Sequence, residues 1–380
     1  SRQYKVSLSR QTYEEYFARI KSGDPSKLVV IIDEAQFVAK RDTSFMEAVA
    51  KLKKHKLYPG PVLIILATSS TVWATQEAAE QFKGAEMKLG SLNFLEVVRH
   101  FESLPVAEIV RIYGAIGGVP AYLDKWDAAK SFKDNICRLV LTSSGALYGE
   151  ADAVISAELR ELSAYSTILA AIARGENKLN DIFHATGFSR AKISVYLKNL
   201  ANFNIVEKVV SFETGGWENA KKGVYQIKDT FVNFWFKFVY PNMSDLYLLS
   251  PEEFYDTYIE KELDAYLERY FREVCTEYLL ILNQMGQLPF TIKRVGTWIG
   301  KTGRIDIVAQ SEDRRSIIGF CNWDKPMMTM DMCENMAMAM DQARLTSDDY
   351  YLFSATDFEP ALQSYVVRDP RFKLINMNEL

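Results

Sequence analysis

Cysteine and histidine, the residues that most often build zinc sites, are scarce in this sequence. Among 380 residues there are four cysteines and three histidines, and no two cysteines form a CxxC pair. Neither a zinc site nor a disulfide framework is indicated, and reduced thiols are expected. The histidines, His55, His100 and His184, lie far apart along the chain, and we interpret them as ordinary surface or core residues.

Long apolar runs are also missing. No stretch approaches the roughly 20 residues that a membrane helix requires, and Ser1–Lys5 lacks the apolar core of a signal peptide. We therefore expect a cytoplasmic protein without membrane contact. The net charge of −4 gives no global field that favours nucleic acid, so such binding would need a local basic patch. The length predicts about two to three domains.

What is present begins with a strand that ends in two acids. Leu28–Ile32 is a run of apolar, mostly β-branched residues, typical of a strand buried on both faces of a parallel sheet. Asp33 and Glu34 follow at its carboxyl end, where open α/β sheets bind their ligands. In a nucleotide-binding sheet Asp33 would engage Mg²⁺ and Glu34 would act on the attacking water. The alternative is a buried strand ending in a solvated acidic turn.

A second strand is predicted beside the first. A helix over residues 44–54 precedes the apolar run Val62–Ala67, and this strand–helix–strand order indicates a parallel βαβ unit. The hydroxyls that follow, Ser69 and Ser70, would then lie beside the two acids, and Ser69 is the candidate sensor of the γ-phosphate. A helix cap or a turn is the alternative for both serines.

The sequence has no phosphate-binding loop to accompany these acids. Such a loop follows a strand and reads GxxxxGK[ST], because its backbone N–H groups and its lysine cradle the phosphates. The nearest match, Gly300-Lys301-Thr302, lacks the first glycine at the required offset. We expect that the loop belongs to an amino-terminal part absent from this chain. A descendant that no longer binds nucleotide is the alternative.

Further pieces along the chain carry a family resemblance together with the acidic strand. They are Leu28–Gln36, Leu66–Ser70, Gly118–Pro120, Leu147–Glu150, Glu158–Arg160, Tyr165–Leu169 and Asp229–Val239. In order and spacing they resemble the archaeal-type ATPases of the STAND branch of the AAA+ class. The resemblance implies ATP and Mg²⁺ as cofactors, and a lid whose GxP proline packs near the adenine. Pro120 is therefore a candidate cofactor-binding residue, with helix initiation as its alternative role.

A winged helix is predicted after the lid. A helix over residues 179–186, a second helix capped by Ser189 and two strands, Ile205–Phe212 and Val224–Ile227, give the order helix, turn, helix and β-hairpin. DNA is the candidate partner, although acids lie close by and a winged helix that only packs against the lid is the alternative. The candidate contacts are exposed positions of the second helix and the wing: Arg190, Lys192, Tyr196, Lys198, Lys221 and Lys222.

Two segments, one rich in aromatic residues and one rich in methionine, each have a structural and a functional interpretation. The aromatic residues of Phe231–Tyr240 have helical spacing, which favours a core helix over base stacking. The methionines of Met327–Met340 follow a similar rhythm on a helix capped near Thr329. Core packing is favoured there, and an adaptable partner-binding face is the alternative.

The carboxyl-terminal segment is predicted to be a long helix, Glu260–Asn283, followed by strands over residues 290–295, 304–309 and 316–322. This order resembles the PD-(D/E)xK nuclease core, in which acids and a lysine hold a metal and orient water. Of these site residues only Asp306 is present in this sequence. Phe320 and Asn322 replace the glutamate and the lysine, and Arg272 stands where the acid on the helix is expected. We expect an inactive nuclease-like domain in which Asp306 forms a surface ion pair with Arg304 and Lys301.

The predicted fold is therefore α/β, with an incomplete parallel-sheet P-loop NTPase core, a helical lid, a winged helix and a carboxyl-terminal restriction-endonuclease-like domain. The expected boundaries are residues 1–105, 106–150, 151–245 and 246–380. The expected function is that of a regulatory or signalling ATPase switch that is inactive as this chain alone. A non-enzymatic DNA-binding or scaffold protein is the alternative. A protein partner and oligomerisation are left open.

Overall fold

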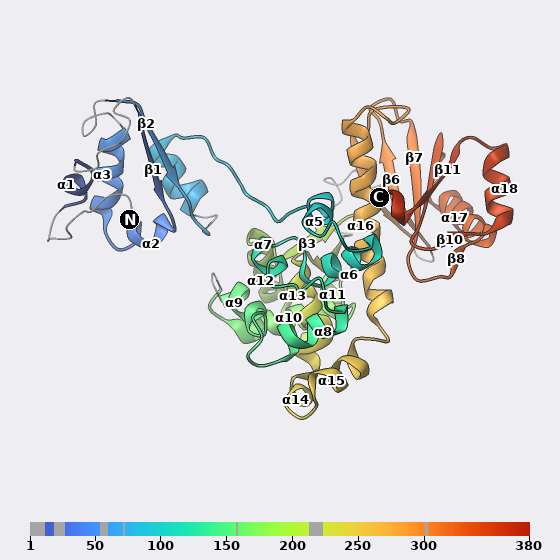
Figure 1. The fold of residues 1–380 in the computed structure, drawn as a ribbon, viewed down its shortest axis with the longest axis horizontal. Coiled ribbons are helices and arrows are strands. Elements are labelled where there is room, and N and C mark those ends of the chain that lie inside the picture. Colours follow the sequence, from blue (N-terminus) through green and yellow to red (C-terminus); the bar gives the residue numbers. More distant parts are fainter. Residues whose placement is uncertain are drawn as a thin grey trace. The chain divides into compact units, whose positions relative to one another are not determined.

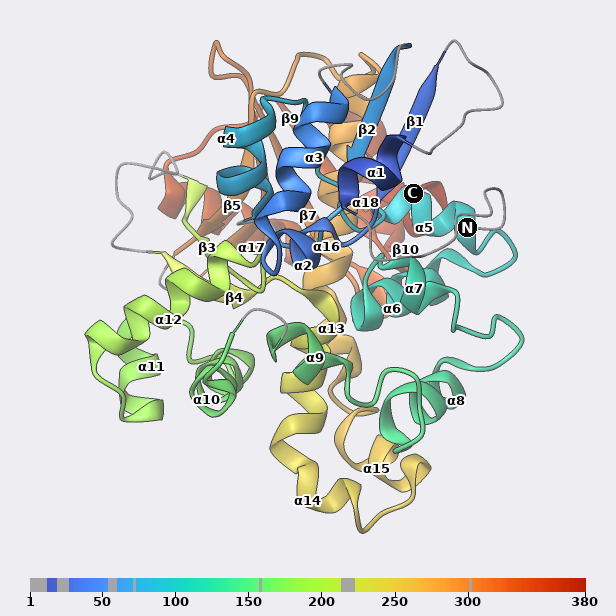
Figure 2. The same cartoon turned by 90° about the vertical axis from the view of Figure 1, so that its left-hand side faces the viewer.

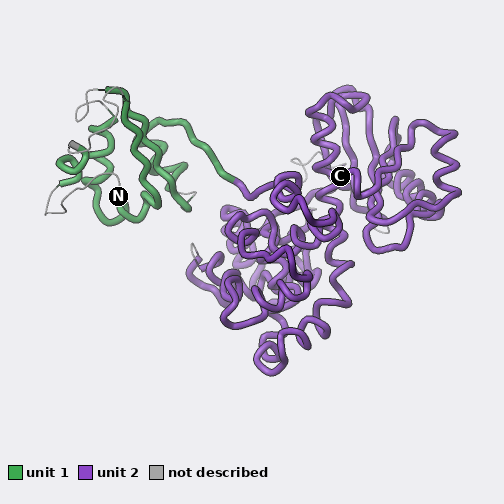
Figure 3. Tube along the Cα trace, viewed as in Figure 1, with its two compact units in different colours: residues 1–89 green, residues 90–380 purple. Residues whose placement is uncertain are grey.

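The computed structural model describes residues 12–18, 27–53, 60–70, 73–156, 159–212, 223–300 and 303–380. The chain divides into two compact units, residues 1–89 and residues 90–380 (Figure 3). Parallel and antiparallel sheets occur together with helices, so the fold is mixed α/β, as predicted. Across the described ranges, no helix combines the length and the apolar character that a bilayer crossing demands.

The first unit is built on two parallel strands. β1 (Leu28–Ile32) and β2 (Val62–Leu66) pair in register from Leu28 opposite Val62 to Ile32 opposite Leu66. The predicted strands and their parallel pairing are thus confirmed. The helical elements of this unit are α1 (Tyr13–Ala18), α2 (Ala35–Ala39), α3 (Thr43–Lys53), the π-helical η1 (Trp73–Ala78) and α4 (Ala79–Phe82).

Helices cover one face of this two-stranded sheet, and the other face is open. The covered face packs against α1, α3 and η1–α4, which lie together beside the strands in Figure 2. The open face presents Val29, Ile31, Leu63 and Ile65, which are 53%, 67%, 56% and 42% exposed. The expectation of strands buried on both faces is therefore wrong for the described residues, because no described element of this unit packs on the second face.

The second unit begins with a helical region. Its core is contributed by buried side chains of nearly every helix, with the aromatic run at its centre: Phe231, Phe234, Trp235, Phe236 and Phe238 are each at most 2% exposed. Core packing of this run is confirmed. The elements are α5 (Phe94–His100), α6 (Val106–Ile116), α7 (Pro120–Leu123), α8 (Phe132–Ile136), η2 (Cys137–Leu141), α9 (Glu150–Ser156), α10 (Leu162–Ala173), α13 (Thr230–Phe234), η5 (Trp235–Val239), η6 (Tyr240–Asn242), α14 (Met243–Leu246) and α15 (Pro251–Tyr258).

A helix–turn–helix and a hairpin lie within this region. The elements are α11 (Leu179–Thr186), α12 (Arg190–Asn202) and the antiparallel pair β3 (Val206–Val209) and β4 (Val224–Ile227). The order predicted from the sequence is present, and Ser189 caps α12 by accepting a hydrogen bond from the Lys192 N–H at 3.2 Å. The expectation that Tyr196 is exposed is wrong. Its ring is buried against Tyr165, with the centroids 4.4 Å apart.

The carboxyl-terminal part is a five-stranded mixed sheet with helices on it (Figure 1). The spatial order is β11-β9-β7-β6-β5; β5, β6 and β7 are antiparallel, and β7, β9 and β11 are parallel. The long helix α16 packs on β6 and β7. The elements are α16 (Leu263–Gln284), β5 (Arg294–Ile299), β6 (Arg304–Gln310), β7 (Ser316–Asn322), β8 (Met327–Met328), α17 (Met330–Ala343), β9 (Asp349–Ser354), β10 (Asp357–Phe358), α18 (Pro360–Arg368), β11 (Phe372–Asn376) and η7 (Met377–Glu379).

The first strand of this sheet lies later in the chain than predicted. The sequence predicts residues 290–295, whereas β5 begins at Arg294 opposite Gln310. The backbone just before it is bound by a side chain: the Ile292 N–H donates to Asn283 Oδ1 at 2.7 Å. The methionine helix is as predicted, because Met336 and Met340 of α17 are buried in the core beneath the sheet.

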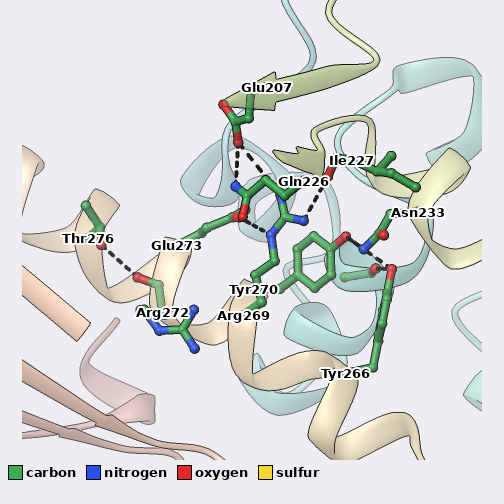
Figure 4. Close-up of polar contacts among 11 residues, drawn as sticks. Glu207, Gln226, Ile227, Asn233, Tyr266, Arg269, Tyr270, Arg272, Glu273 and Thr276 are labelled. Atoms are coloured by element: carbon green, nitrogen blue, oxygen red, sulfur yellow. Dashed lines mark hydrogen bonds and ion pairs between the residues drawn. The ribbon is translucent and has the colours of Figure 1, made fainter. Parts of the chain in front are cut away.

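Helix α16 also ties the hairpin and α13 to the sheet (Figure 4). The Arg269 guanidinium donates to the Ile227 carbonyl of β4 and to the Glu273 carboxylate, both at 2.8 Å. The hydroxyl of the next residue, Tyr270, accepts from Asn233 Nδ2 of α13 at 2.8 Å. These bonds come from one helix to two neighbouring elements, so they hold the middle of the chain and the carboxyl-terminal sheet together.

Candidate functional site

Glu34, the second acid after β1, lies beside Ser69, the first of the two serines after β2. Ser70 does not reach the acids in this way: its Oγ accepts from the Trp73 N–H at 3.3 Å, at the start of η1, so the capping alternative holds for Ser70. The Ser69 hydroxyl donates to Glu34 Oε2 at 2.9 Å, and the Ser69 backbone N–H approaches the same oxygen at 3.3 Å. Gln36 Nε2 donates to Glu34 Oε2 at 2.5 Å and to Ser69 Oγ at 3.1 Å. The structure thus brings together Glu34 and Ser69, which the sequence placed on adjacent strand ends, and adds Gln36.

The backbone fixes this arrangement. The Ala67 N–H donates to the Ile32 carbonyl and the Ala35 N–H donates to the Ala67 carbonyl, so the parallel ladder continues past the strand ends. Glu34 lies between these bonds with φ 47° and ψ 43°, in the left-handed region that a non-glycine residue rarely adopts. Strained residues of this kind cluster at functional sites, where the surroundings hold them in place.

Asp33 points differently from Glu34. Its Oδ1 accepts from the Glu34 N–H at 3.0 Å and its side chain is exposed, so the second oxygen is accessible to solvent. One exposed carboxylate oxygen beside a strand end is suited to a Mg²⁺ ion that keeps most of its waters. Asp33 and Glu34 therefore differ in accessibility and in partners.

Hydrogen bonds dominate the electrostatics of Glu34. The bonds from Gln36 and Ser69 stabilise the carboxylate and hold the pKa of Glu34 below its ordinary value. Gln36 itself is 2% exposed, and its Oε1 has no hydrogen-bond donor. A buried amide oxygen without a donor is uncommon, so this end of the site holds an acceptor that a further group could satisfy.

The described residues fit only part of a magnesium–nucleotide complex. Two carboxylates and a hydroxyl are hard oxygen ligands of the type that Mg²⁺ prefers. No glycine-rich segment with a lysine accompanies them, so nothing in this chain matches a phosphate cradle. Among the described residues, no group of three or more His, Cys, Asp and Glu side chains is arranged around a metal position.

Pro120 lies in a rigid corner of the second unit. It is the first residue of α7, where its missing N–H costs no hydrogen bond. The corner before it is closed by the Leu92 N–H, which donates to the Gly118 carbonyl at 2.8 Å. A Cβ on Gly118 would lie 1.9 Å from the Leu92 carbonyl oxygen, so only glycine fits there. Helix initiation accounts for Pro120, and its nucleotide-side role stays a prediction.

The candidate cations of α12 are engaged to different degrees. The Arg190 guanidinium lies 4.2 Å from the Phe183 ring centroid and donates to Asn180 Oδ1 at 2.6 Å. Lys192 is half-buried, with its amine 4.4 Å from the Phe188 ring. Lys198 is exposed. Lys221 and Lys222 lie outside the described residues.

Asp306 is paired inside the carboxyl-terminal domain. Its Oδ1 accepts from Arg272 Nε at 2.9 Å and from Arg304 Nε at 3.1 Å. Its Oδ2 accepts from the Cys321 N–H at 3.1 Å. The side chains of Asp306 and Arg272 are only 12% and 15% exposed, so the expectation of a surface pair is wrong. Burial raises the pKa of Asp306, and the Arg272 guanidinium opposes that effect.

Phe320 and Asn322 take structural positions. Phe320 packs against the core that includes the α17 methionines. Asn322 is 2% exposed, and its amide donates to Ser354 Oγ at 3.0 Å and to Thr356 Oγ1 at 3.3 Å. Neither side chain is a hydrogen-bond partner of Asp306. Lys301, the other predicted ion-pair partner, lies outside the described residues.

Sequence reasoning assigned no role to Gln36 and did not pair Arg272 with Asp306. Gln36 was part of the acidic strand motif, and its place two residues after Glu34 is the one signal that could have identified it. Arg272 was identified as the residue that stands where the helix acid is expected, but its partner Asp306 is 34 residues away in sequence. A cation at a position where a metal ligand is expected is the signal that could have suggested the pair.

Comparisons with known proteins give one family match and distant relatives. A family model described as archaeal and bacterial proteins of unknown function, DUF234, matches residues 235–338. An uncharacterised protein of Methanocaldococcus jannaschii, MJECL04, is 27% identical over 326 residues, which span 84% of this chain and 71% of that protein.

Two solved structures are similar at low TM-scores. A Walker-type ATPase of Pyrococcus abyssi has a TM-score of 0.35 and 17% identity, over 55% of this chain and 63% of that one. Protein VC1899 from Vibrio cholerae has a TM-score of 0.23 and 10% identity, over 98% of this chain and 93% of that one. The chain thus spans less than two thirds of the P. abyssi protein.

Proposed function

We propose that Asp33, Glu34 and Ser69 are the acid and sensor side of an ATP-hydrolysing site. The observation that supports this most is the bond from the Ser69 hydroxyl to the Glu34 carboxylate, which joins the ends of two parallel strands. The carboxyl edge of a parallel sheet is where α/β proteins bind nucleotides.

The roles follow from accessibility and partners. Asp33, with an exposed oxygen, would hold Mg²⁺, which would neutralise charge on the phosphates. Glu34 is ionised at neutral pH, because its pKa lies below the ordinary value. A carboxylate that accepts several hydrogen bonds is a weak base, so Glu34 would orient an attacking water more than deprotonate it. Ser69, and the Gln36 amide behind it, would keep the carboxylate directed.

The phosphate cradle would come from a strand–loop–helix with the GxxxxGK[ST] pattern, which this chain does not contain. The open apolar face of β1 and β2 supports this proposal. Parallel sheets are normally covered on both faces, and Val29, Ile31, Leu63 and Ile65 leave apolar surface for such a segment. The Gln36 Oε1 acceptor would gain a donor in the complete site.

The rest of the chain would act as the output of a regulatory switch. In this proposal the second unit consists of a lid, a winged helix and a nuclease-like domain without nuclease activity. The ion pair from Arg272 to Asp306 supports inactivity, because a guanidinium occupies the carboxylate that a metal would need. A plasmid cleavage assay with Mg²⁺ should show no cutting; robust cutting lost on Asp306→Ala would overturn this part.

The ATPase proposal is tested by nucleotide binding in two chains. This polypeptide should bind ATP very weakly or not at all, because it lacks the phosphate cradle. A chain extended upstream to include a GxxxxGK[ST] loop should bind ATP, and Lys→Ala in that loop should abolish the binding. Equal ATP affinity of the short and extended chains would refute the proposal.

A second candidate function is DNA binding through α12, which presents Arg190 and Lys198 on its exposed side. Lys198→Gln is the cleanest test, because this side chain has no described partner. If α12 contacts phosphates, the variant should lower DNA affinity and reduce the slope of log affinity against log salt by about 0.9. Arg174→Gln, an exposed cation at the end of α10, is the matched control. Unchanged DNA affinity in both variants would exclude this candidate.

A further inference from the structure

A cavity in the second unit is lined by none of the candidate site residues named above. It has a volume of about 770 Å³ and lies between the segment from Lys125 to Lys130 and the turn Thr142–Ala146. We propose that this cavity binds a small phosphate-bearing ligand. The volume is within the range of ordinary small-molecule sites, roughly 300–1,000 Å³.

The central cation of the cavity is held in position. Arg138 Nη2 donates to the Lys125 carbonyl at 2.8 Å and to Asn135 Oδ1 at 3.0 Å. The remaining donors, Nε and Nη1, have no hydrogen-bond partner among the described residues. An arginine fixed through Nη2 keeps Nε and Nη1 as two separate charge-assisted donors, each of which can bind a phosphate oxygen.

A buried amide fixes the segment that carries the two lysines. Asn135 is fully buried, and its Nδ2 donates to the carbonyls of Asp127 and Ser131 at 2.9 and 3.1 Å. Its Oδ1 accepts from the Asp127 N–H at 3.0 Å. Because one side chain satisfies several backbone groups of this segment, Lys125 and Lys130 extend from a defined backbone. Little ordering would be required when a ligand binds.

The opposite wall supplies hydroxyl and amide groups. Thr142 and Ser144 line the cavity. The Thr142 hydroxyl already donates to the Cys137 carbonyl at 2.8 Å, so Ser144 supplies the available hydroxyl donor. The backbone N–H groups of Ser144 and Ala146 have no partner among the described residues. A Cβ on Gly145 would lie 2.5 Å from the Leu139 carbonyl oxygen, so the turn packs directly on η2. Amide N–H groups, hydroxyls and cations on facing walls are the donors that bind phosphate in proteins.

The charges that line the cavity predict whether each substitution raises or lowers the affinity for an anion. Three cations line the cavity, Lys125, Lys130 and Arg138, together with two carboxylates, Asp134 and Glu252. The excess of one positive charge favours an anion. Asp134 is already a hydrogen-bond acceptor for Ser131 Oγ at 2.7 Å. Glu252, at the start of α15, opposes an anion and should set an upper limit on its affinity.

The test is calorimetric titration of this chain with inorganic phosphate and with pyrophosphate in roughly 0.1 M salt. Saturable binding is expected, and Lys125→Gln should weaken it about tenfold through loss of one charged contact. The fold should survive this change, because Lys125 supports Arg138 through its backbone carbonyl. Arg138→Gln should weaken binding further, and Glu252→Gln should strengthen it several-fold.

Arg174→Gln, an exposed cation outside the cavity, is the control and should leave affinity unchanged. The proposal is overturned if neither phosphate nor pyrophosphate binds saturably, or if the control weakens binding as much as Lys125→Gln. Binding only of a single-stranded oligonucleotide, added as a third titrant, would overturn it in favour of nucleic acid. None of these outcomes depends on ATP hydrolysis at Glu34.

Discussion

The Ser69 hydroxyl donates a hydrogen bond to the Glu34 carboxylate, with Oγ and Oε2 2.9 Å apart. The two residues are 35 positions apart in sequence and follow neighbouring parallel strands. The bond joins the carboxyl ends of β1 and β2, the two strands described in the first unit. In this state Glu34 is satisfied by protein groups, so a ligand that recruits it must compete with Ser69 and Gln36.

Removal of this bond should change the titration of Glu34. Ser69→Ala removes one of the hydrogen bonds that hold the pKa of Glu34 low, so the pKa should rise toward its ordinary value. The Gln36 bond remains, and the shift should be partial. Carboxyl-carbon NMR titration measures it, with Glu34→Gln to assign the signal. An unchanged pKa would contradict the geometry of this site.

The hydrogen bond from Ser69 to Glu34 also affects how the free energy of unfolding depends on pH. The folded-state pKa of Glu34 is lowered, so its contribution to stability is present above the unfolded-state pKa, about 4.3. That contribution is lost as pH falls through the lowered folded-state pKa. Ser69→Ala raises the folded-state pKa of Glu34 toward the unfolded-state value, so less stability is lost on acidification. Urea unfolding should therefore show a smaller difference in the free energy of unfolding between pH 7 and pH values below 5 in the variant than in the parent.

Loss of Arg272 should destabilise the carboxyl-terminal domain. Arg272→Met leaves the buried Asp306 carboxylate with Arg304, whose side chain is 42% exposed, as its remaining ion-pair partner. We expect a loss of about 2–4 kcal/mol in the free energy of unfolding, measured by urea denaturation. Arg304→Ala should cost less than about 1 kcal/mol, because that partner is solvated. Arg272→Met combined with Asp306→Asn should be more stable than Arg272→Met alone. If it is not, the pair does not hold a buried charge.

The corner before Pro120 should tolerate no added methyl group. Gly118→Ala places a Cβ on the Leu92 carbonyl oxygen, and the backbone must move. We expect a loss of about 3 kcal/mol in the free energy of unfolding. Gly149→Ala is the matched control, since no atom lies within 4 Å of its added Cβ. The two changes remove the same unfolded-state freedom, so similar stabilities of the two variants would show that the corner is not tightly packed.

Local patterns predicted most of the elements, because runs of apolar residues bounded by polar turns leave few alternatives. β1, β2, α11 and β4 lie where the sequence predicted them, whereas β3 is shorter than the predicted strand Ile205–Phe212. β5 was misplaced because residues 290–295 have the same strand-like composition as the residues that follow. In the structure the Ile292 N–H donates to the Asn283 side chain, whereas the Lys293 N–H donates to Gln310 of β6. Strand propensity contains no information on such a contact.

Site residues were predictable where chemistry and topology coincide, and not where tertiary packing decides. Glu34 and Ser69 could be placed together because parallel strands end at one edge. Tyr196 has a polar end and helical spacing that permits exposure, but it packs on Tyr165 from another helix. The open face of β1 and β2 could not be predicted, since an apolar strand has the same sequence whether or not an element covers it.

The most direct measurement of the central claim is ATP turnover by the upstream-extended chain with and without Glu34→Gln. The variant should bind ATP as tightly as its parent, because the change is isosteric and leaves Asp33 in place. Its hydrolysis should fall by at least about 100-fold, the order expected for loss of a group that orients or activates the attacking water. Hydrolysis at the parent's rate by Glu34→Gln would contradict the account.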